Sequence, residues 1–154
     1  MRAHSIRTDQ GPEIDLDSPD LLKRARYELS RHNPVLLRVT GSAMRPSIED
    51  GDVVTVEPIS GQSVHSGDIV LYQSLRDTAL IHRVVKLETR PSGRFIVTRG
   101  DASTSLDVPV PVHHVMGRVK EISREGEKIE VIAQRRGLLG ILRALFAWLG
   151  LAKS

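Results

Sequence analysis

The sequence predicts a mostly β fold, an antiparallel β domain with a short N-terminal helix and a C-terminal amphipathic helix. From residue 34 onward the chain breaks into short β-branched runs with period-two alternation, each bounded by Gly, Pro, Ser or Asp. Hairpin signals occur at PSG (91–93) and REGE (124–127). The 154 residues, 40% of them hydrophobic, are about one domain's worth and can fill one core. We therefore expect one compact β domain over residues 34–133.

The chain before this domain divides into a lead and a helix. Residues 1–18 mix charged residues with Gly and Pro without periodicity, which predicts a disordered lead. Ser18 and Pro19 are typical of a helix start, and Asn33-Pro34 ends the pattern, so residues 19–33 are expected to form a short helix. Its apolar positions are Leu21, Leu22, Ala25, Tyr27 and Leu29.

Seven strands are expected within the β domain. In chain order they are VLLRV, DVVTVEP, DIVLYQS, IHRVVKLE, RFIVTR, HVMGRVKEI and KIEVIA. Strands that follow one another through tight turns pair antiparallel, because a two-residue hairpin can join only antiparallel strands. The sequence therefore predicts a mostly antiparallel sheet.

The last segment, residues 134–154, returns to a helical pattern with a wide apolar face and basic residues near its ends. Such a helix is typical of a membrane interface, and packing onto the domain or a partner subunit is the alternative. Its apolar stretch covers roughly 24 Å, less than the roughly 30 Å of a bilayer core. The opening residues lack the apolar core of a secretory signal, so we expect the cytoplasmic side, peripheral to the inner membrane. The residues expected at the membrane are Arg135, Arg136, Arg143, Phe146 and Trp148.

Composition excludes several classes of protein. The absence of cysteine excludes disulfides, thiolate nucleophiles and Cys-based zinc sites. A net charge of +3 and a single basic helix do not indicate a nucleic-acid partner. His113 and His114 would point to opposite faces of a strand, without a carboxylate cluster beside them, so we expect no metal and no cofactor.

Four segments that join a strand to a turn carry the chemistry: GSAMRPSIEDGD (41–52), SGDIVLY (66–72), LIHRVV (80–85) and TRGDAS (98–103) followed by Asp107. A Gly-Ser approach to a Met-x-Pro turn can present a hydroxyl beside backbone N–H groups, as a nucleophile and an oxyanion hole require. His82 in an apolar run can be a general base. Asp101, after Gly100, can orient an imidazole. Each pattern alone also fits a core histidine or a plain turn.

Together these segments resemble the signal peptidase I superfamily, which includes the LexA-type self-cleaving repressors. His82 resembles the base of the archaeal and endoplasmic-reticulum branch, where histidine replaces lysine. The boxes of the family follow in order as Met44-Arg45-Pro46, Gly51-Asp52-Val53, Gly67-Asp68-Ile69, His82-Arg83-Val84, Arg99-Gly100-Asp101 with Asp107, and Met116-Gly117-Arg118.

The resemblance implies peptide-bond hydrolysis by a serine, with His82 as general base, Asp101 or Asp107 orienting it and the N–H of residue 43 stabilising the oxyanion. It also implies a peptide or precursor substrate, bound extended along a strand edge with small side chains near the cut. We expect that edge at VEPISG (56–61) and at the strands flanking the Met turn.

The chain departs from the family at the nucleophile, because the serine before the Met is here Ala43, whose methyl group cannot attack a carbonyl. Ser42 lies one residue earlier and would face the opposite way on an extended chain unless a bulge re-aims it. Gly41, Met44 and Pro46 would shape the turn. Three interpretations stay open: an engineered inactive variant, a peptidase using Ser42 or another hydroxyl, and a non-catalytic peptide-binding relative. A serine endopeptidase acting near the membrane is the leading hypothesis, and the peptide-binding relative is the alternative.

Overall fold

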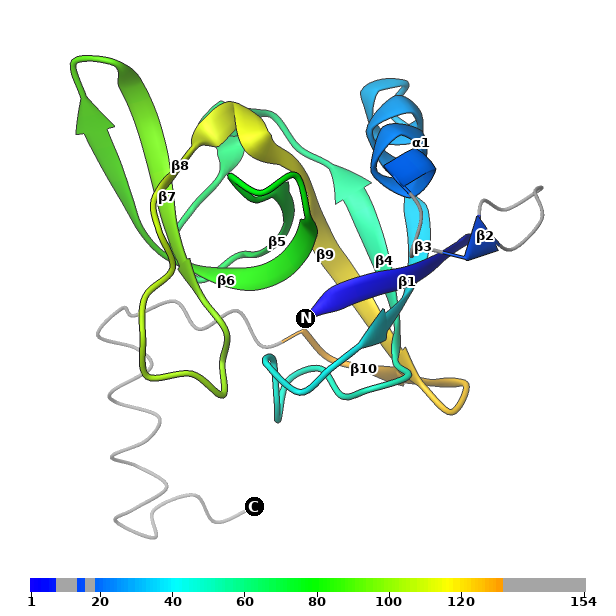
Figure 1. Ribbon diagram of the computed structural model, residues 1–154. Helices are drawn as coiled ribbons and strands as arrows, with labels where there is room; N and C mark the ends of the chain where they lie inside the picture. The colour runs from blue at the N-terminus through cyan, green and yellow to red at the C-terminus, as the bar shows by residue number, and fades with distance from the viewer. Residues whose placement is uncertain (8–13, 16–18, 132–154) are drawn as a thin grey trace, which may run out of the picture.

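The computed structural model describes residues 1–7, 14–15 and 19–131, and within them it confirms a mostly antiparallel β fold with a short N-terminal helix (Figure 1). Six of the seven expected runs form strands, and the seventh, KIEVIA, does so at Lys128 and Ile129, with residues 132–133 outside the described part. The elements are β1 (Arg2–Arg7), β2 (Ile14–Asp15), α1 (Pro19–Ser30), β3 (Val35–Thr40), β4 (Val53–Pro58), β5 (Ile69–Gln73), β6 (Ala79–Arg90), β7 (Gly93–Arg99), β8 (Val110–Pro111), β9 (Val115–Arg124) and β10 (Glu127–Ile129). The expected helix over 134–154, with its five membrane residues, lies outside the described residues.

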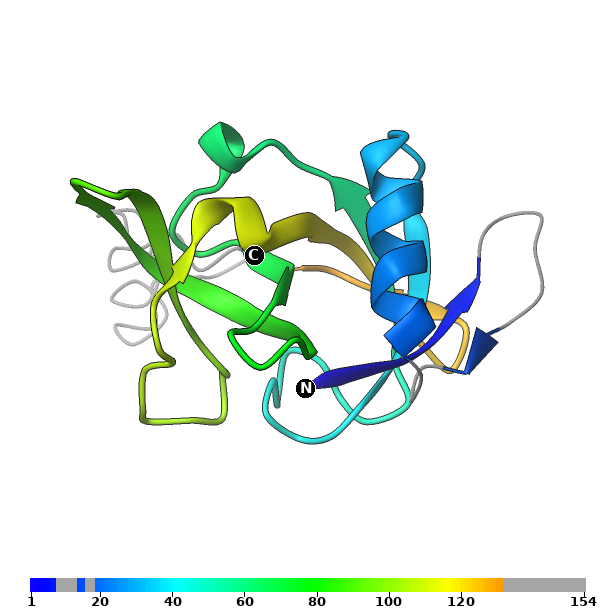
Figure 2. The same ribbon diagram turned by 45° about the horizontal axis from the view of Figure 1, so that its top comes forward.

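The strands wrap into a closed ring. Neighbours pair antiparallel in the order β1, β3, β4, β9, β5 and β6, and a pairing of β6 with β1 closes the ring. That closing pairing has a single register pair, Arg2 with Leu80. β7 and β8 extend the sheet outward from β6, and Figures 1 and 2 show the long β6–β7 hairpin projecting on the side away from α1.

Both expected hairpin turns are confirmed. Arg90 pairs with Gly93 across the PSG turn of β6 and β7, and Arg124 pairs with Glu127 across the turn of β9 and β10. In the second turn Glu125 and Gly126 have φ of 52° and 86°. Two successive positive φ values match the right-handed twist of the flanking strands, which is why this turn closes a hairpin with two residues.

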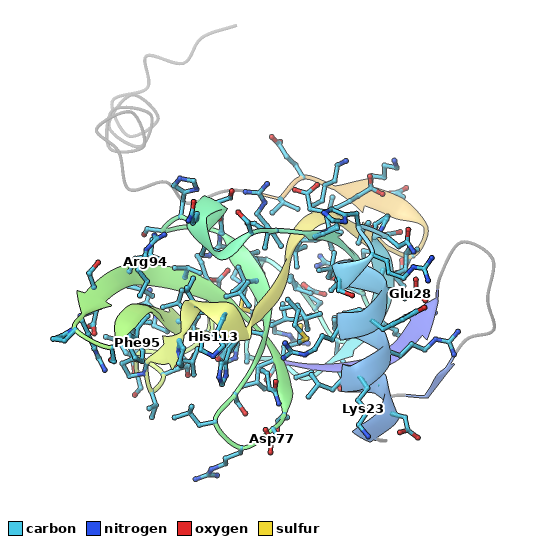
Figure 3. All side chains as sticks on the ribbon, turned by 90° about the horizontal axis from the view of Figure 1, so that it is seen from above. Lys23, Glu28, Asp77, Arg94, Phe95 and His113 are labelled. Carbon is cyan, nitrogen blue, oxygen red and sulfur yellow. The ribbon has the colours of Figure 1, made fainter. Side chains whose placement is uncertain are left out.

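The main hydrophobic core lies where α1 packs against the ring. Leu21, Ala25 and Leu29 of α1 are buried, as their helical spacing predicted, but Tyr27 is 55% exposed, so its place on the apolar face was wrong. A second cluster lies around Tyr72 on the β7 side of the ring. Figure 3 shows α1 and β7 on opposite sides of the molecule, with Lys23 and Glu28 on α1 and Arg94 and Phe95 on β7. Among the described helices none is long and apolar enough to span a bilayer.

The prediction of a disordered lead over residues 1–18 is wrong for the part that the structure describes. Residues 2–7 form β1, and residues 14–15 form β2. β1 pairs with β3 over most of its length, from Arg2 opposite Thr40 to Arg7 opposite Leu36. The side chains of this segment have no periodic pattern, so the sequence gives no sign of a strand. The segment becomes a strand because its backbone forms hydrogen bonds with the edge of β3.

Candidate active site

β6 carries His82 at the centre of the candidate site, where the strand pairs with β5. The imidazole Nδ1 lies 2.6 Å from Oδ2 of Asp107, which comes from the segment between β7 and β8. Because an ionised carboxylate can only accept, Nδ1 carries the proton, and Nε2 of the neutral ring is left as the basic nitrogen. The two side chains therefore have the arrangement of a general base and the carboxylate that orients it.

Two hydroxyl groups surround the Asp107 carboxylate. The buried Thr98 on β7 donates its hydroxyl hydrogen to Oδ2 at 2.7 Å, and the Tyr72 hydroxyl on β5 lies 3.5 Å from the same atom. The hydroxyls of Thr98 and Tyr72 are 3.0 Å apart. Burial raises the pKa of Tyr72 to about 12, so it stays protonated. These contacts hold the carboxylate that faces His82 in one orientation.

The surroundings of His82 favour its neutral form. Burial lowers the pKa of the imidazole below its ordinary value, and the hydrogen bond to Asp107 raises it again only in part. The α-amino nitrogen of Met1 lies 3.3 Å from Nε2, and its positive charge lowers the pKa further. A neutral imidazole at pH 7 is the form that can accept a proton.

Asp101, the other candidate carboxylate, contacts Arg83 and not His82. Nε and Nη2 of Arg83 donate to its two oxygens at 2.7 and 2.6 Å, and the Ser47 hydroxyl donates to Oδ2 at 2.6 Å. Arg83 also donates to the carbonyl of Gly67. Burial would raise the pKa of Asp101, but the hydrogen bonds from Arg83 and Ser47 outweigh it and the pKa is lowered. Of the two carboxylates, the structure brings only Asp107 to the histidine.

The Met turn is joined to the segment that holds both aspartates. The carbonyl of Ala43 accepts the N–H of Ala102 at 2.9 Å. A Cβ added to Gly100 would lie 2.5 Å from that carbonyl oxygen and 3.3 Å from Cβ of Ala43, so only glycine fits this approach. Met44 is fully buried in the main core. Residue 43 is thus held against the Gly100–Asp101 turn.

The remaining residues of the turn lie on its outer side. Ser42 and Pro46 are exposed, and the carbonyl of Ser42 accepts the N–H of Arg45. Gly41 has φ of +101°, a conformation that favours glycine, and its N–H donates to Asp50. The Ser42 hydroxyl therefore belongs to the exposed part of the turn, while Ala43 is partly buried.

The Gly-Asp boxes earlier in the chain are structural. The buried Asp52 accepts the N–H of Glu49 and two hydrogen bonds from Arg124 at 3.0 and 2.9 Å, which closes the end of the Met turn. Asp68 accepts the N–H of His65 in the turn before β5. Both carboxylates stabilise turns that orient the strands around His82.

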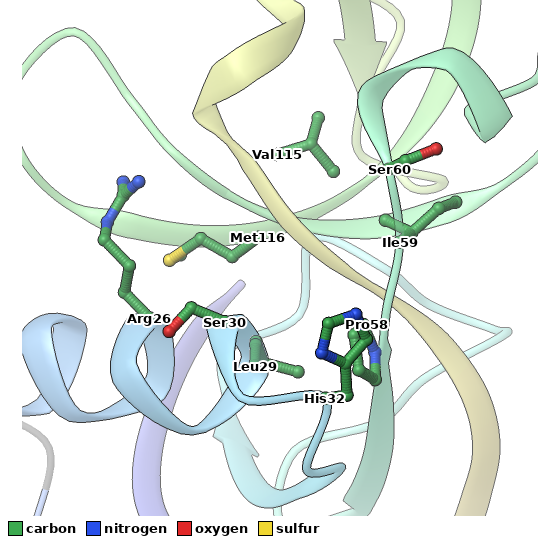
Figure 4. Close-up of a pocket in the computed structure, with 9 residues that line it drawn as sticks. All are labelled: Arg26, Leu29, Ser30, His32, Pro58, Ile59, Ser60, Val115 and Met116. Atoms are coloured by element: carbon green, nitrogen blue, oxygen red, sulfur yellow. The ribbon is translucent and has the colours of Figure 1, made fainter.

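Two other features lie apart from the His82–Asp107 pair. His113 and His114 are in a single 3-10 turn, and Nδ1 of His114 lies 2.9 Å from the carbonyl oxygen of Gln73. Among the described residues, no group of three or more His, Cys, Asp or Glu could hold a metal ion. A cavity of about 350 Å³ opens between α1 and β9 (Figure 4), where the Ser30 hydroxyl donates to the carbonyl of Tyr27.

A second cavity, of about 420 Å³, adjoins the candidate site because Asp107 and Leu80 are in its lining. Tyr72, Val108 and Val110 are among the other lining residues, so much of its wall is apolar. The carboxylate partner of His82, Asp107, therefore borders a space that side chains of a bound peptide can enter.

The sheet pairing limits the expected substrate edge at its first residue. Val56 of VEPISG is paired with both β3 and β9, whereas the ladder with β3 ends there and Glu57 and Pro58 pair with β9. The other strand flanking the Met turn, β3, has its second edge beside β1. The second edge of β3, along which the chain enters the Met turn, therefore faces β6, and β1 lies between these two strands.

Sequence reasoning named His82 as the partner of Asp101 or Asp107, but it missed Arg83 as the partner of Asp101 and the hydroxyls of Thr98 and Tyr72 beside Asp107. Arg83 had a usable signal, since an arginine inside the apolar run LIHRVV is expected to be buried and to need a carboxylate. Thr98 and Tyr72 carried none, because their side chains are ordinary in strands and only the tertiary structure brings them to Asp107.

This arrangement, a histidine on a closed antiparallel sheet with a carboxylate from the adjoining segment, is that of a peptidase-like site. Residues 8–95 match the family described as Peptidase S24-like, and the chain belongs to this family.

Among curated proteins, the chain is 25% identical to the signal peptidase complex catalytic subunit sec11 of Schizosaccharomyces pombe, over 77% of the chain and 65% of that protein. It is 28% identical to the corresponding subunit of Yarrowia lipolytica, over 75% of the chain and 64% of that protein. It is also 28% identical to chaperone protein DnaJ 2 of Thermus thermophilus, over 87% of the chain and 42% of that protein. The chain thus spans less than two thirds of each of these relatives.

Proposed function

We propose that this domain is a signal-peptidase-like serine endopeptidase domain that acts on extended peptides or precursor proteins, and that residue 43 is its nucleophile position. The observation that carries the proposal is the 2.6 Å contact between Nδ1 of His82 and the Asp107 carboxylate, supported by Thr98. The similarity to two catalytic subunits of signal peptidase complexes supports the same class of reaction.

With a serine at position 43, the proposed mechanism begins at His82. Nε2 takes the hydroxyl proton as the oxygen attacks the peptide carbonyl, and the N–H of residue 43 stabilises the oxyanion. The imidazolium, oriented by Asp107, then gives that proton to the leaving amine as the C–N bond breaks. Water, activated by the same imidazole, hydrolyses the acyl-enzyme and restores the serine.

The residue at position 43 decides whether the chain can cleave a peptide. The methyl group of Ala43 has no proton to give and no lone pair to attack with, so we propose that the chain with Ala43 holds peptides and does not cut them. This is the alternative function, a peptide-binding relative. The exposed Ser42 is the nearest hydroxyl along the chain, and it would have to turn inward to replace the missing one.

The test compares the unmodified chain, Ala43→Ser, Ala43→Ser with His82→Gln, and Ser42→Ala on a panel of precursor-derived peptides, with cleavage followed by mass spectrometry. We expect Ala43→Ser to cleave, and His82→Gln to lower its rate about 10²–10⁴-fold, the usual contribution of a general base. Cleavage by the unmodified chain that Ser42→Ala abolishes would assign the nucleophile to Ser42 instead. A folded Ala43→Ser that cleaves none of the peptides would overturn the peptidase proposal.

We also propose, from the sequence pattern alone, that residues 134–154 bring the domain to the cytoplasmic face of a membrane. The test is sedimentation with vesicles of phosphatidylcholine alone or mixed with phosphatidylglycerol. Changing Arg135 and Arg136 to Ser is expected to reduce binding to the anionic vesicles, because each basic residue near such a surface contributes about 1 kcal/mol. Changing Lys23 and Arg24 of α1 to Ser is the matched control. Equal losses for both pairs would contradict the proposal.

A further inference from the structure

The sheet edge that leads to His82 is occupied by the chain's own N-terminal strand. β1 runs antiparallel to β3 along the strand that enters the Met turn, with Ala3 opposite Val39 and Arg2 opposite Thr40. On its other side, Arg2 lies opposite Leu80 of β6, and the N–H of Ile81 donates to the carbonyl of Met1 at 3.1 Å. Residues 1–2 therefore bridge β3, which leads into the Met turn, and β6, which carries His82.

The same segment reaches the reactive atom of the site. The α-amino nitrogen of Met1 lies 3.3 Å from Nε2 of His82, the nitrogen that remains after Nδ1 has bound Asp107. The Met1 side chain is only 6% exposed and belongs to the main core with Met44 and Ile81. Met1 thus takes up the space in front of the base that a nucleophile and a substrate would need.

β1 is well paired on one side and barely paired on the other. Its ladder with β3 has five register pairs, with a shift between Ala3 and Ser5, whereas its ladder with β6 has a single pair. β4, by contrast, has four pairs with β3 and six with β9. Because the side of β1 toward β6 has few backbone contacts, it is expected to open at lower free energy than a strand that is paired along both sides.

We propose that residues 1–7 are an autoinhibitory strand, which occupies the peptide-binding edge between β3 and β6 and must be displaced before a substrate peptide can pair there. This rests on the proposed function, because the edge matters only if peptides bind beside His82. A peptide that adds a strand here competes with β1 for the same backbone groups of β3 and for the N–H of Ile81. The apparent affinity of such a peptide equals its intrinsic affinity multiplied by the fraction of molecules in which β1 is displaced, so a small displaced fraction means weak binding.

The chain has no cysteine, so a disulfide can be introduced to lock β1 reversibly. Arg2→Cys with Thr40→Cys joins two residues that are opposite each other in the register, a spacing that a disulfide can span. The control is Ser123→Cys with Lys128→Cys, a registered pair of β9 and β10 away from the edge. The probe is a fluorescein-labelled peptide with the sequence of β1 and Met1, MRAHSIR, and its binding is measured by fluorescence anisotropy.

We expect the oxidised lock to bind this peptide at least about tenfold more weakly than the same protein after reduction, while the control pair shows no redox effect. Ala3→Pro removes a backbone donor within β1 and is expected to strengthen binding by about tenfold, because it raises the displaced fraction. Circular dichroism verifies that each variant is folded. Equal binding by the oxidised and reduced lock would overturn the proposal.

A second measurement separates this proposal from the peptidase proposal. In the Ala43→Ser background, cleavage of precursor peptides is compared between the oxidised and reduced lock. Faster cleavage after reduction supports both proposals. Redox-dependent binding of MRAHSIR without cleavage in either state keeps the autoinhibitory strand and refutes the peptidase, whereas cleavage at equal rates in both states refutes the autoinhibitory strand alone.

Discussion

His82 and Arg83 are neighbours on β6, and each is paired with an aspartate from the segment between β7 and β8. Successive side chains point to opposite sides of a strand, so the two pairs face different surroundings. The side chains of Arg83 and Asp101 are 7% and 10% exposed, and those of His82 and Asp107 are 12% and 31% exposed. The pair with the permanent cation is thus the more deeply buried one.

This difference separates the structural pair from the chemical pair. Arg83 stays charged at every accessible pH and offers several donors in a rigid plane, so it can join β6, the Met turn and the Asp101 segment without changing state. The imidazole of His82 can take up and release a proton, and its neutral form, which burial favours, is the one that accepts it. The arginine beside the base therefore positions the loop on which the base depends.

Arg83→Met is expected to have the largest effect, a loss of stability. Removing the guanidinium leaves the buried Asp101 carboxylate without its cation, a change that typically costs about 3–5 kcal/mol. The matched change on the other pair, His82→Gln, is expected to cost much less, because the Asp107 side chain is 31% exposed, against 10% for Asp101, so water can replace the lost partner. Urea unfolding of both variants measures the difference, and equal losses would remove the distinction between the two pairs.

A smaller loss of stability is expected from Gly100→Ala. The new Cβ would lie 2.5 Å from the carbonyl oxygen of Ala43, so the two turns must move apart, at about 1–3 kcal/mol for overpacking. Gly61→Ala is the control, since its Cβ would lie 3.2 Å from the side chain of Val112 and 3.7 Å from the nearest backbone atom, the Val112 carbonyl oxygen. In the Ala43→Ser background, Gly100→Ala should also slow cleavage, whereas a normal rate would show that the contact does not position residue 43.

The two pairs are expected to lose stability in different pH ranges. Asp101 has a lowered pKa in the folded state, so its contribution is present above the ordinary value of 3.8 and is lost as the pH falls through the folded pKa. His82 also has a lowered pKa, so the unfolded chain takes up the proton first and stability falls as the pH drops below 6.5. Urea midpoints between pH 8 and pH 5 should fall less in His82→Gln than in the unmodified chain. A pH profile that the substitution leaves unchanged would contradict the assigned shift.

The smallest effect is on the titration of His82 itself. Asp107→Asn removes the hydrogen bond and the negative charge that raise the pKa of the imidazole, so this pKa should fall further below its ordinary value. Asp77→Asn, in the exposed β5–β6 turn, should leave it unchanged. NMR titration of the imidazole resonances measures both, and a raised pKa in Asp107→Asn would refute the role assigned to this carboxylate.

Most of the fold could be predicted because its signals are local. Alternation of apolar residues and paired turn residues lie within a few positions of each other, so the runs from VLLRV to KIEVIA and the turn at Glu125 and Gly126 could be recognised from the sequence. β1 could not, because its order comes from backbone pairing with β3 and not from its own pattern. The site divides in the same way: His82 stands out in an apolar run, whereas Thr98 gains its role only through Asp107.

The sequence by itself determined the types of elements, the candidate base and the missing hydroxyl at Ala43, since these depend on residue identity and spacing alone. Only the tertiary structure decided that Asp107 meets His82 while Asp101 binds Arg83, and that β1 covers the edge beside them. The physical reason is that both aspartates lie in one turn-rich segment with no periodic signal. Which carboxylate reaches which partner depends on the faces of β6 and the packing of β7, and neither is encoded within a short stretch of chain.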